Sequence, residues 1–247
     1  MKSLQLKVLS VVASALTVLG AVAAPQATAA ERNLVAFGDS VLADPDAGSY
    51  FAHRYDRSKG VGVDCPTSNN YAKRAGAKLR LPVRDFSCSG AVSMSRGPQI
   101  FQQVDAAIRT GALSPATNRV VITTGFNDTY NHRDMSLPQI RKEFADRTAP
   151  QIERIKRAAP NARVQIVGYP TIGTGPYYCL FHFGPRPADS TFLPGIQDFE
   201  NKAQWMQVDL AAYEPAWSRA CGQRHRPLLK RVFNNAPVLK ISVRSGA

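Results

Sequence analysis

Residues 34–40 form the run Leu34-Val35-Ala36-Phe37-Gly38-Asp39-Ser40. Four consecutive apolar residues are typical of a strand that is buried on both faces, as in a parallel sheet covered by helices. Gly38 directly follows the run and permits a tight turn. Ser40 is therefore expected just beyond the carboxyl end of a buried strand. Because ligands bind at that edge of parallel sheets, these seven residues also indicate where the chemistry lies.

Further along the chain, short apolar runs rich in β-branched residues alternate with stretches of helical periodicity. Strands are predicted at 34–37, 81–86, 120–123 and 164–167, and helices at 70–79, 98–110, 137–159 and 196–212. Pro150 predicts a break in the third helix, and the many Gly, Pro and aromatic residues of 173–194 predict a long loop. This alternation predicts a three-layer α/β/α domain around a parallel sheet.

Composition limits the classes of protein. The chain has 247 residues, of which 44% are hydrophobic and 20% charged, and this profile excludes disorder, collagen and coiled coil as global classes. The net charge of +13 suggests anionic surroundings. No acidic residue follows Glu214, whereas basic residues recur at 219, 224, 226, 230, 231, 240 and 244. Aromatic residues are not interleaved with this basic tail, so specific nucleic-acid binding is not expected.

The N-terminus has the features of a secretory signal peptide. Lys2 and Lys7 are followed by an apolar run over 8–24 and by the small-x-small pattern Ala27-Thr28-Ala29. Residues 1–29 are therefore predicted to be a signal peptide, and residues 30–247 a single secreted domain with an atypical basic segment from about 214. The alternative is a membrane anchor, for which the apolar run is short.

Export also determines how the cysteines are interpreted. Four are present, at 65, 88, 179 and 221, and in an exported chain they are expected to form disulfides. Three pairings are possible. The pairs Cys65–Cys88 and Cys179–Cys221 close the shortest loops without entangling; the alternative is that one or two of the thiols are free and buried.

Three small polar turns follow three of the predicted strands. They contain Ser40, Gly90 and Asn127. Each alone is adequately explained as a turn or a helix cap. Together they supply a hydroxyl nucleophile, a backbone N–H and a side-chain amide, which are the parts of an acyl-transfer site with an oxyanion hole.

These turns carry a resemblance to a known family. The blocks Phe37-Gly38-Asp39-Ser40, Cys88-Ser89-Gly90-Ala91 and Gly125-Phe126-Asn127-Asp128 resemble, in order and separation, those of the SGNH (GDSL-type) hydrolases, especially the secreted actinobacterial esterase and lipase branch. The run Val167-Gly168-Tyr169-Pro170 is also similar to that branch, and the likeness covers about 34–212.

The resemblance implies a flavodoxin-like sheet. The mechanism that these residues suggest needs no cofactor. The resemblance further implies that Ser40 is the nucleophile. The oxyanion hole would be formed by the backbone N–H groups of Ser40 and Gly90 and by the side chain of Asn127.

The catalytic base is the point at which the chain departs from the family. The family ends in an Asp-x-x-His block, which this chain lacks; its histidines are at 53, 132, 182 and 225. By position His225 is expected to be the base, with a main-chain carbonyl in place of the missing aspartate, and His182 is the runner-up. Two alternatives stay open: His225 is one more cation of the basic tail, or a frameshift has altered this end of the chain.

The sequence therefore predicts a secreted, monomeric serine esterase or lipase that acts on a small-molecule or lipid ester. The competing hypothesis is a catalytically impaired SGNH-fold binding protein that holds anionic cell-wall or lipid surfaces.

Overall fold

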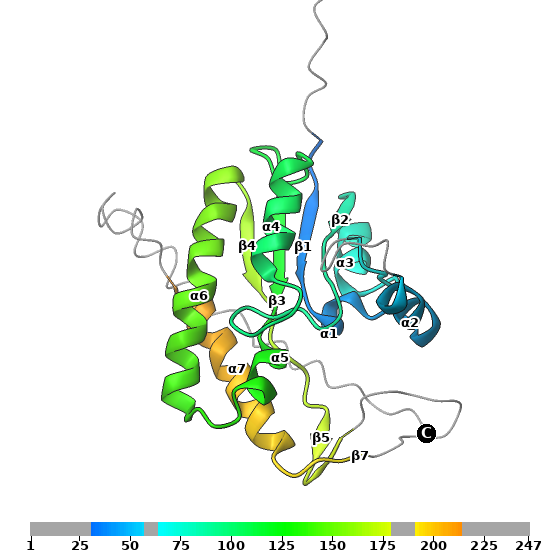
Figure 1. The fold of residues 1–247 in the computed structure, drawn as a ribbon. Coiled ribbons are helices and arrows are strands. Elements are labelled where there is room, and N and C mark those ends of the chain that lie inside the picture. Colours follow the sequence, from blue (N-terminus) through cyan, green and yellow to red (C-terminus); the bar gives the residue numbers. More distant parts are fainter. Residues whose placement is uncertain (1–30, 57–63, 179–190, 214–247) are drawn as a thin grey trace, which may run out of the picture.

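The computed structural model describes residues 31–56, 64–178 and 191–213. Its centre is a parallel four-stranded sheet in the order β2-β1-β3-β4 (Figure 1). The strands are β1 (Leu34–Gly38), β2 (Val83–Asp85), β3 (Arg119–Thr123) and β4 (Arg163–Ile166). This arrangement confirms the predicted α/β class and all four predicted strands.

Helices cover both faces of the sheet. Successive residues of β1 point to opposite faces, so β1 contributes side chains to a core on each side. Val35 and Phe37 pack into one core with α4 (Ile100–Arg109), α6 (Leu137–Ala158) and α7 (Ile196–Ala212). Leu34 and Ala36 pack into a second core with α1 (Ser40–Ala43) and α3 (Tyr71–Leu79). All of β1 is buried, as the continuous apolar run predicts.

The predicted break in the third helix is wrong. Helix α6 runs without interruption from Leu137 to Ala158 with Pro150 inside it. Phe144 lies before the proline and Ile152 after it, and both are buried in the same core. Packing of one continuous apolar face outweighs the backbone hydrogen bond that the proline cannot make.

The predicted long loop over 173–194 is wrong in part. It contains three two-residue strands, β5 (Gly173–Thr174), β6 (Tyr177–Tyr178) and β7 (Thr191–Phe192), which form an antiparallel sheet in that order. Strands of two residues are too short to show an alternating pattern in the sequence.

Three short helices were not predicted from periodicity, α1 among them. Helix α5 (Phe126–Asn131) follows β3. Helix α2 (Ala47–Tyr55) begins at an Asp46 cap and contains no buried residue, so it lacks the apolar face by which helices are recognised.

Several predictions fall outside the described residues. These are the signal peptide 1–29, the basic segment from about 214, and the residues Cys179, His182, Cys221 and His225. In the described ranges, no helix combines the length and the apolar character needed to cross a bilayer.

Candidate active site

Ser40 lies at the carboxyl end of β1, as predicted. It is the first residue of α1 and is exposed, whereas Asp39 before it is fully buried and caps the helix by accepting a hydrogen bond from the Val41 N–H (3.0 Å). Among the described residues, neither the hydroxyl nor the backbone N–H of Ser40 has a hydrogen-bond partner. Both groups are thus available to a ligand at the start of a helix.

The turn before Ser40 is held from the helix layer. Gln103 of α4 is fully buried; its side-chain oxygen accepts from the Gly38 N–H and its side-chain nitrogen donates to the Gly38 carbonyl, each at 2.9 Å. A side chain is excluded at Gly38, because a Cβ there would lie 2.6 Å from the Thr123 carbonyl oxygen of the neighbouring strand. The end of β1 is therefore fixed in place on two sides.

Gly90 lies on the loop after β2, at the same edge of the sheet. Its φ of +82° is in the left-handed region, which favours glycine, and a Cβ there would meet nothing within 4 Å. The loop is tied to β1 by a hydrogen bond from the Cys88 N–H to the Gly38 carbonyl (2.9 Å). In the described part of the chain, the Gly90 N–H has no acceptor.

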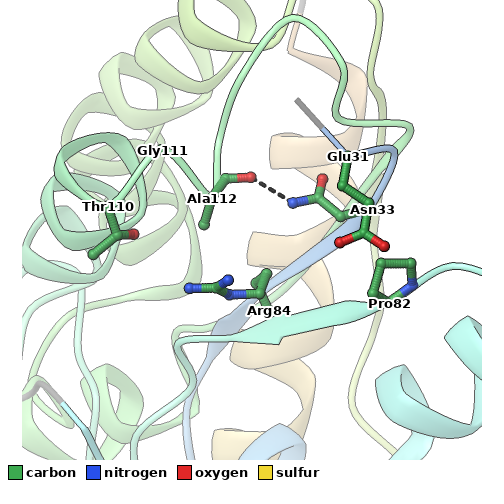
Figure 2. A pocket seen from close by; sticks show the side chains of 7 residues that line it. All are labelled: Glu31, Asn33, Pro82, Arg84, Thr110, Gly111 and Ala112. Atoms are coloured by element: carbon green, nitrogen blue, oxygen red, sulfur yellow. Dashed lines mark hydrogen bonds between the residues drawn. The ribbon is translucent and has the colours of Figure 1, made fainter. Parts of the chain in front are cut away.

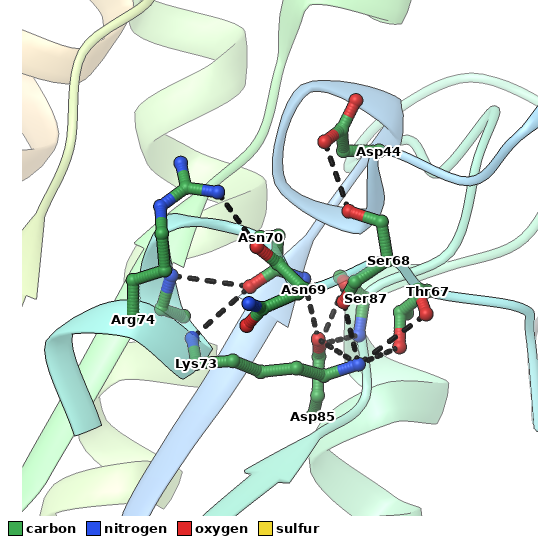
Figure 3. Close-up of polar contacts among 10 residues, drawn as sticks. Asp44, Thr67, Ser68, Asn69, Asn70, Lys73, Arg74, Asp85 and Ser87 are labelled. Atoms are coloured by element: carbon green, nitrogen blue, oxygen red, sulfur yellow. Dashed lines mark hydrogen bonds and ion pairs between the residues drawn. The ribbon is translucent and has the colours of Figure 1, made fainter. Parts of the chain in front are cut away.

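The loop that carries Gly90 is also held covalently. Cys88 forms the predicted disulfide with Cys65. Beside the disulfide, Asp85 accepts hydrogen bonds from both the backbone N–H (3.0 Å) and the hydroxyl (2.6 Å) of Ser87, and from the Asn70 side chain (2.7 Å) (Figure 3).

Lys73 joins the other half of this polar network. Its ammonium group donates to the Thr67 hydroxyl (2.6 Å) and the Ser68 carbonyl (2.7 Å) and lies 4.0 Å from Asp85 (Figure 3). The Ser68 hydroxyl in turn donates to Asp44, directly after α1 (2.9 Å). The network connects α1, α3 and the end of β2, so it sets the position of the Gly90 loop relative to Ser40.

Asn127 lies in the first turn of α5, after β3, and is 8% exposed. Its Nδ2 donates to the Ala91 carbonyl (2.8 Å), and its Oδ1 accepts from the Tyr130 hydroxyl (2.6 Å). These two bonds fix the orientation of the amide. Since a side-chain amide has two N–H donors, one donor of Asn127 is left without a partner in the described residues.

The neighbouring carboxylate fixes the loop after Gly90. Asp128 is fully buried and accepts hydrogen bonds from the backbone N–H groups of Ser93 (2.8 Å), Met94 (3.1 Å) and Ser95 (2.9 Å). The Ser95 hydroxyl adds a fourth bond (2.7 Å). The turns after β2 and β3 are thus held together by both Asn127 and Asp128.

A fourth strand end contributes Tyr169, which follows β4. Its hydroxyl donates to Oδ2 of Asp39 and accepts from the Phe126 N–H (3.0 Å). Burial raises the pKa of Asp39 to about 7, with a smaller contribution from Asp128, and the hydrogen bonds from Tyr169 and the Val41 N–H oppose this rise. Burial, together with the nearby Asp39, raises the pKa of Tyr169 well above its usual value.

Neither described histidine forms a hydrogen bond with Ser40. His132 ends α5 and donates its backbone N–H to the Asp128 carbonyl (3.0 Å), and His53 lies in α2. The Nε2 atoms of both are buried without a hydrogen-bond partner in the described ranges.

A cavity of about 150 Å³ lies at the opposite end of the sheet, where the strands β1 and β2 begin (Figure 2). It is formed by the residues before β1, by Pro82 and Arg84 at β2, and by 110–112 after α4. It is separate from the turns of Ser40, Gly90 and Asn127. No group of three or more His, Cys, Asp or Glu side chains in the described residues could hold a metal ion.

Sequence reasoning missed four residues that hold the candidate site: Gln103, Asp128, Tyr130 and Tyr169. Asp128 and Tyr169 belong to the matched runs 125–128 and 167–170, so the sequence indicates that they lie near the site but not which groups they bind. Gln103 gave a weaker signal, as a polar residue on the otherwise apolar face of α4.

The model of the GDSL-like lipase/acylhydrolase family matches residues 36–230. None of the curated proteins matches the chain.

Similar solved structures include two from Streptomyces. An extracellular lipase from Streptomyces rimosus is 21% identical, with 73% of each chain covered and a TM-score of 0.40. Phospholipase A1 from Streptomyces albidoflavus is 22% identical, with 74% of this chain and 73% of that chain covered and a TM-score of 0.40. A carbohydrate acetylesterase from Sinorhizobium meliloti is 16% identical, with 74% and 77% covered and a TM-score of 0.36.

The family assignment rests on the family model, which covers all three turns and the sheet except for the first two residues of β1. With its parallel sheet and the ordered blocks at 37–40, 88–91 and 125–128, the chain belongs to the GDSL-like lipase/acylhydrolase family.

Proposed function

We propose that the protein hydrolyses carboxylic esters with Ser40 as the nucleophile. The observation that carries the proposal is the placement of Ser40: it is exposed at the first position of α1, with its hydroxyl and backbone N–H both unpaired in the described residues. Membership of the GDSL-like lipase/acylhydrolase family supports the same reaction class.

The oxyanion hole is assigned to three donors on three strand ends. They are the backbone N–H groups of Ser40 and Gly90 and the second side-chain N–H of Asn127. Each is unpaired in the described part of the chain. Donors that are already oriented stabilise the negative oxygen of a tetrahedral intermediate at little reorganisation cost.

The reaction then proceeds in two halves. A base removes the Ser40 proton as Oγ attacks the ester carbonyl carbon, and the oxyanion is held by the three donors. The protonated base gives its proton to the leaving alcohol, and an acyl-enzyme forms. Water, activated by the same base, attacks the acyl-enzyme and releases the acid and free Ser40.

We assign the base to His225, with His182 as the alternative. Histidine suits this step because its unperturbed pKa lies near neutral pH. The family order favours His225, since it is the histidine nearest the C-terminus. We also propose that the protein is secreted, as the signal-peptide pattern of 1–29 and the Cys65–Cys88 disulfide both favour.

The test is turnover of p-nitrophenyl acetate and p-nitrophenyl octanoate by the purified full chain. Ser40→Ala should abolish turnover while the unfolding temperature is unchanged, because the exposed hydroxyl supports no core. Ser49→Ala is the matched control: it removes an exposed serine from the first turn of the neighbouring helix α2 and should keep wild-type turnover. Near-normal turnover of Ser40→Ala would remove Ser40 from the mechanism.

The same assay identifies the base. His225→Ala should lower turnover nearly as far as Ser40→Ala, and the double variant should be no worse than either, because groups that act as a unit are not additive. If only His182→Ala is inactive, the base is His182. If the wild type hydrolyses neither ester, the alternative of an impaired protein that binds anionic cell-wall or lipid surfaces takes precedence.

A further inference from the structure

The Tyr169 hydroxyl joins two of the turns that form the candidate site. Tyr169 follows β4 and is 7% exposed. Its oxygen donates its proton to Oδ2 of Asp39 and accepts from the Phe126 N–H at 3.0 Å. Its ring also packs against that of Phe126, with centroids 5.3 Å apart.

Both partners are direct neighbours of proposed catalytic groups. Asp39 precedes Ser40 and caps the helix that Ser40 begins. Phe126 precedes Asn127 and begins α5. One phenolic oxygen after β4 therefore sets the distance between the turn of the nucleophile and the turn of the oxyanion donor.

The second oxygen of Asp39 completes the chain of contacts. Oδ1 accepts from the Val41 N–H at 3.0 Å, so both carboxylate oxygens are used when the group is ionised. A protonated Asp39 would have to donate to Tyr169 instead, and the phenol would lose its acceptor.

The charged and titratable groups around the pair come from several elements. Asp128 of α5 raises the pKa of Asp39, and Tyr71 of α3 acts on Tyr169. Burial is the largest cause of the raised pKa of Asp39, and the Tyr169 hydroxyl is the largest influence that lowers it. The hydrogen bond thus favours the ionised form that the bridge requires.

We propose that Tyr169 is a positioning residue for ester hydrolysis, holding the Ser40 turn against the Asn127 turn through Asp39 and Phe126. This inference rests on the proposed function. It assigns no contact between Tyr169 and substrate, so its removal should affect the alignment of the reacting groups more than substrate binding.

The experiment compares Tyr169→Phe with the wild type in kcat and KM over pH 5–9 on p-nitrophenyl acetate. We expect kcat to fall about 10- to 100-fold, as for a small misplacement of reacting groups, with KM nearly unchanged. The acidic limb of the kcat profile should move to higher pH, because Asp39 loses the donor that favours its ionised form.

Tyr213→Phe is the matched control. Tyr213 also donates its hydroxyl to a carboxylate, Glu153 of α6 (2.7 Å), but it caps the carboxyl end of α7 and follows none of the sheet strands. It should leave kcat and the pH profile unchanged. A kcat loss of equal size in both variants, without movement of the acidic limb in Tyr169→Phe, would assign Tyr169 a merely structural role and overturn the proposal.

Two further measurements separate this inference from the proposed function. Carboxyl ¹³C NMR should show a higher pKa for Asp39 in Tyr169→Phe than in the wild type; an unchanged value overturns the bridge even if the enzyme is active. Labelling of Ser40 by a fluorophosphonate should be slower in Tyr169→Phe. A wild type that is labelled but hydrolyses no ester refutes the proposed function alone, and one that is neither labelled nor active refutes both.

Discussion

At the scale of single residues, the candidate site depends on which hydrogen-bonding groups bond within the protein and which remain available to a ligand. Asn127 has its oxygen and one N–H engaged by Tyr130 and Ala91. Its orientation is thereby set before any ligand arrives, which is the condition for an effective oxyanion donor.

Asn127→Ala should lower kcat on p-nitrophenyl acetate by about 10²- to 10³-fold, as is typical when one such donor is lost. KM should change little, since the oxyanion exists only after attack. Asn131→Ala, at the exposed end of the same helix, is the control and should have wild-type kinetics. A change confined to KM would instead make Asn127 a substrate-binding residue.

The sequence predicts the position of Ser40, Gly90 and Asn127 because apolar runs mark the strands and each residue follows one closely. It does not predict Gln103 or Tyr169. Their partners lie 65 and 130 residues away along the chain, so the contacts exist only once strands and helices are packed. The role of Asp128 was missed for the same reason, since it binds residues more than 30 positions away.

At the scale of elements, the helix layer controls the strand end that precedes Ser40. Gln103 presents its amide from α4 to both backbone groups of Gly38. The carbonyl has a second partner in the Cys88 N–H, whereas the Gly38 N–H depends on Gln103 alone among the described residues. The contact between α4 and β1 is therefore polar at one point in an otherwise apolar interface.

Gln103→Leu should lower the free energy of unfolding by about 1–3 kcal/mol, the cost of a buried donor left without a partner. Chemical denaturation measures this loss, and kcat should fall with it because the Ser40 turn loosens. The control is Gln204→Leu, which changes an exposed glutamine of α7. Equal stability of the two variants would contradict the role assigned to the amide.

At the scale of the whole molecule, two helix caps near the site respond to pH in opposite ways. Asp39 and Asp46 cap consecutive helices, α1 and α2. Burial raises the pKa of Asp39 from 3.8 to about 7, whereas hydrogen bonds from Ser49 lower the pKa of exposed Asp46. The two aspartates hold the same position relative to their helices, yet their pKa values shift in opposite directions because one is buried and the other is exposed.

For Asp39 the folded state holds its proton up to about pH 7, while the unfolded chain releases it near 3.8. This group therefore lowers global stability as pH rises through that window, by about 1.4 kcal/mol for each pH unit. Asp39→Asn keeps a side-chain oxygen that can cap α1 and removes the pH dependence of stability that comes from Asp39. The free energy of unfolding of the variant relative to the wild type should rise between pH 4 and 7 and level off above 7.

Denaturation midpoints at pH 4, 5.5, 7 and 8 provide the measurement. Asp46→Asn is the control, because the lowered pKa of Asp46 makes its stabilisation complete above about pH 4 and lost only at lower pH. The difference in the free energy of unfolding between Asp46→Asn and the wild type should be constant over the same pH range. Parallel curves for Asp39→Asn and the wild type would show that Asp39 is ionised throughout.

Helix α2 has a consequence for how the molecule opens. It spans nine residues, none of which is fully buried, and Phe51 and Tyr55 are exposed. An isolated helix of this length is marginal in water, and none of its residues belongs to either hydrophobic core. Its amide protons should therefore exchange with solvent long before those of β1, and a protease should reach the backbone beside Arg54 while the two cores stay folded.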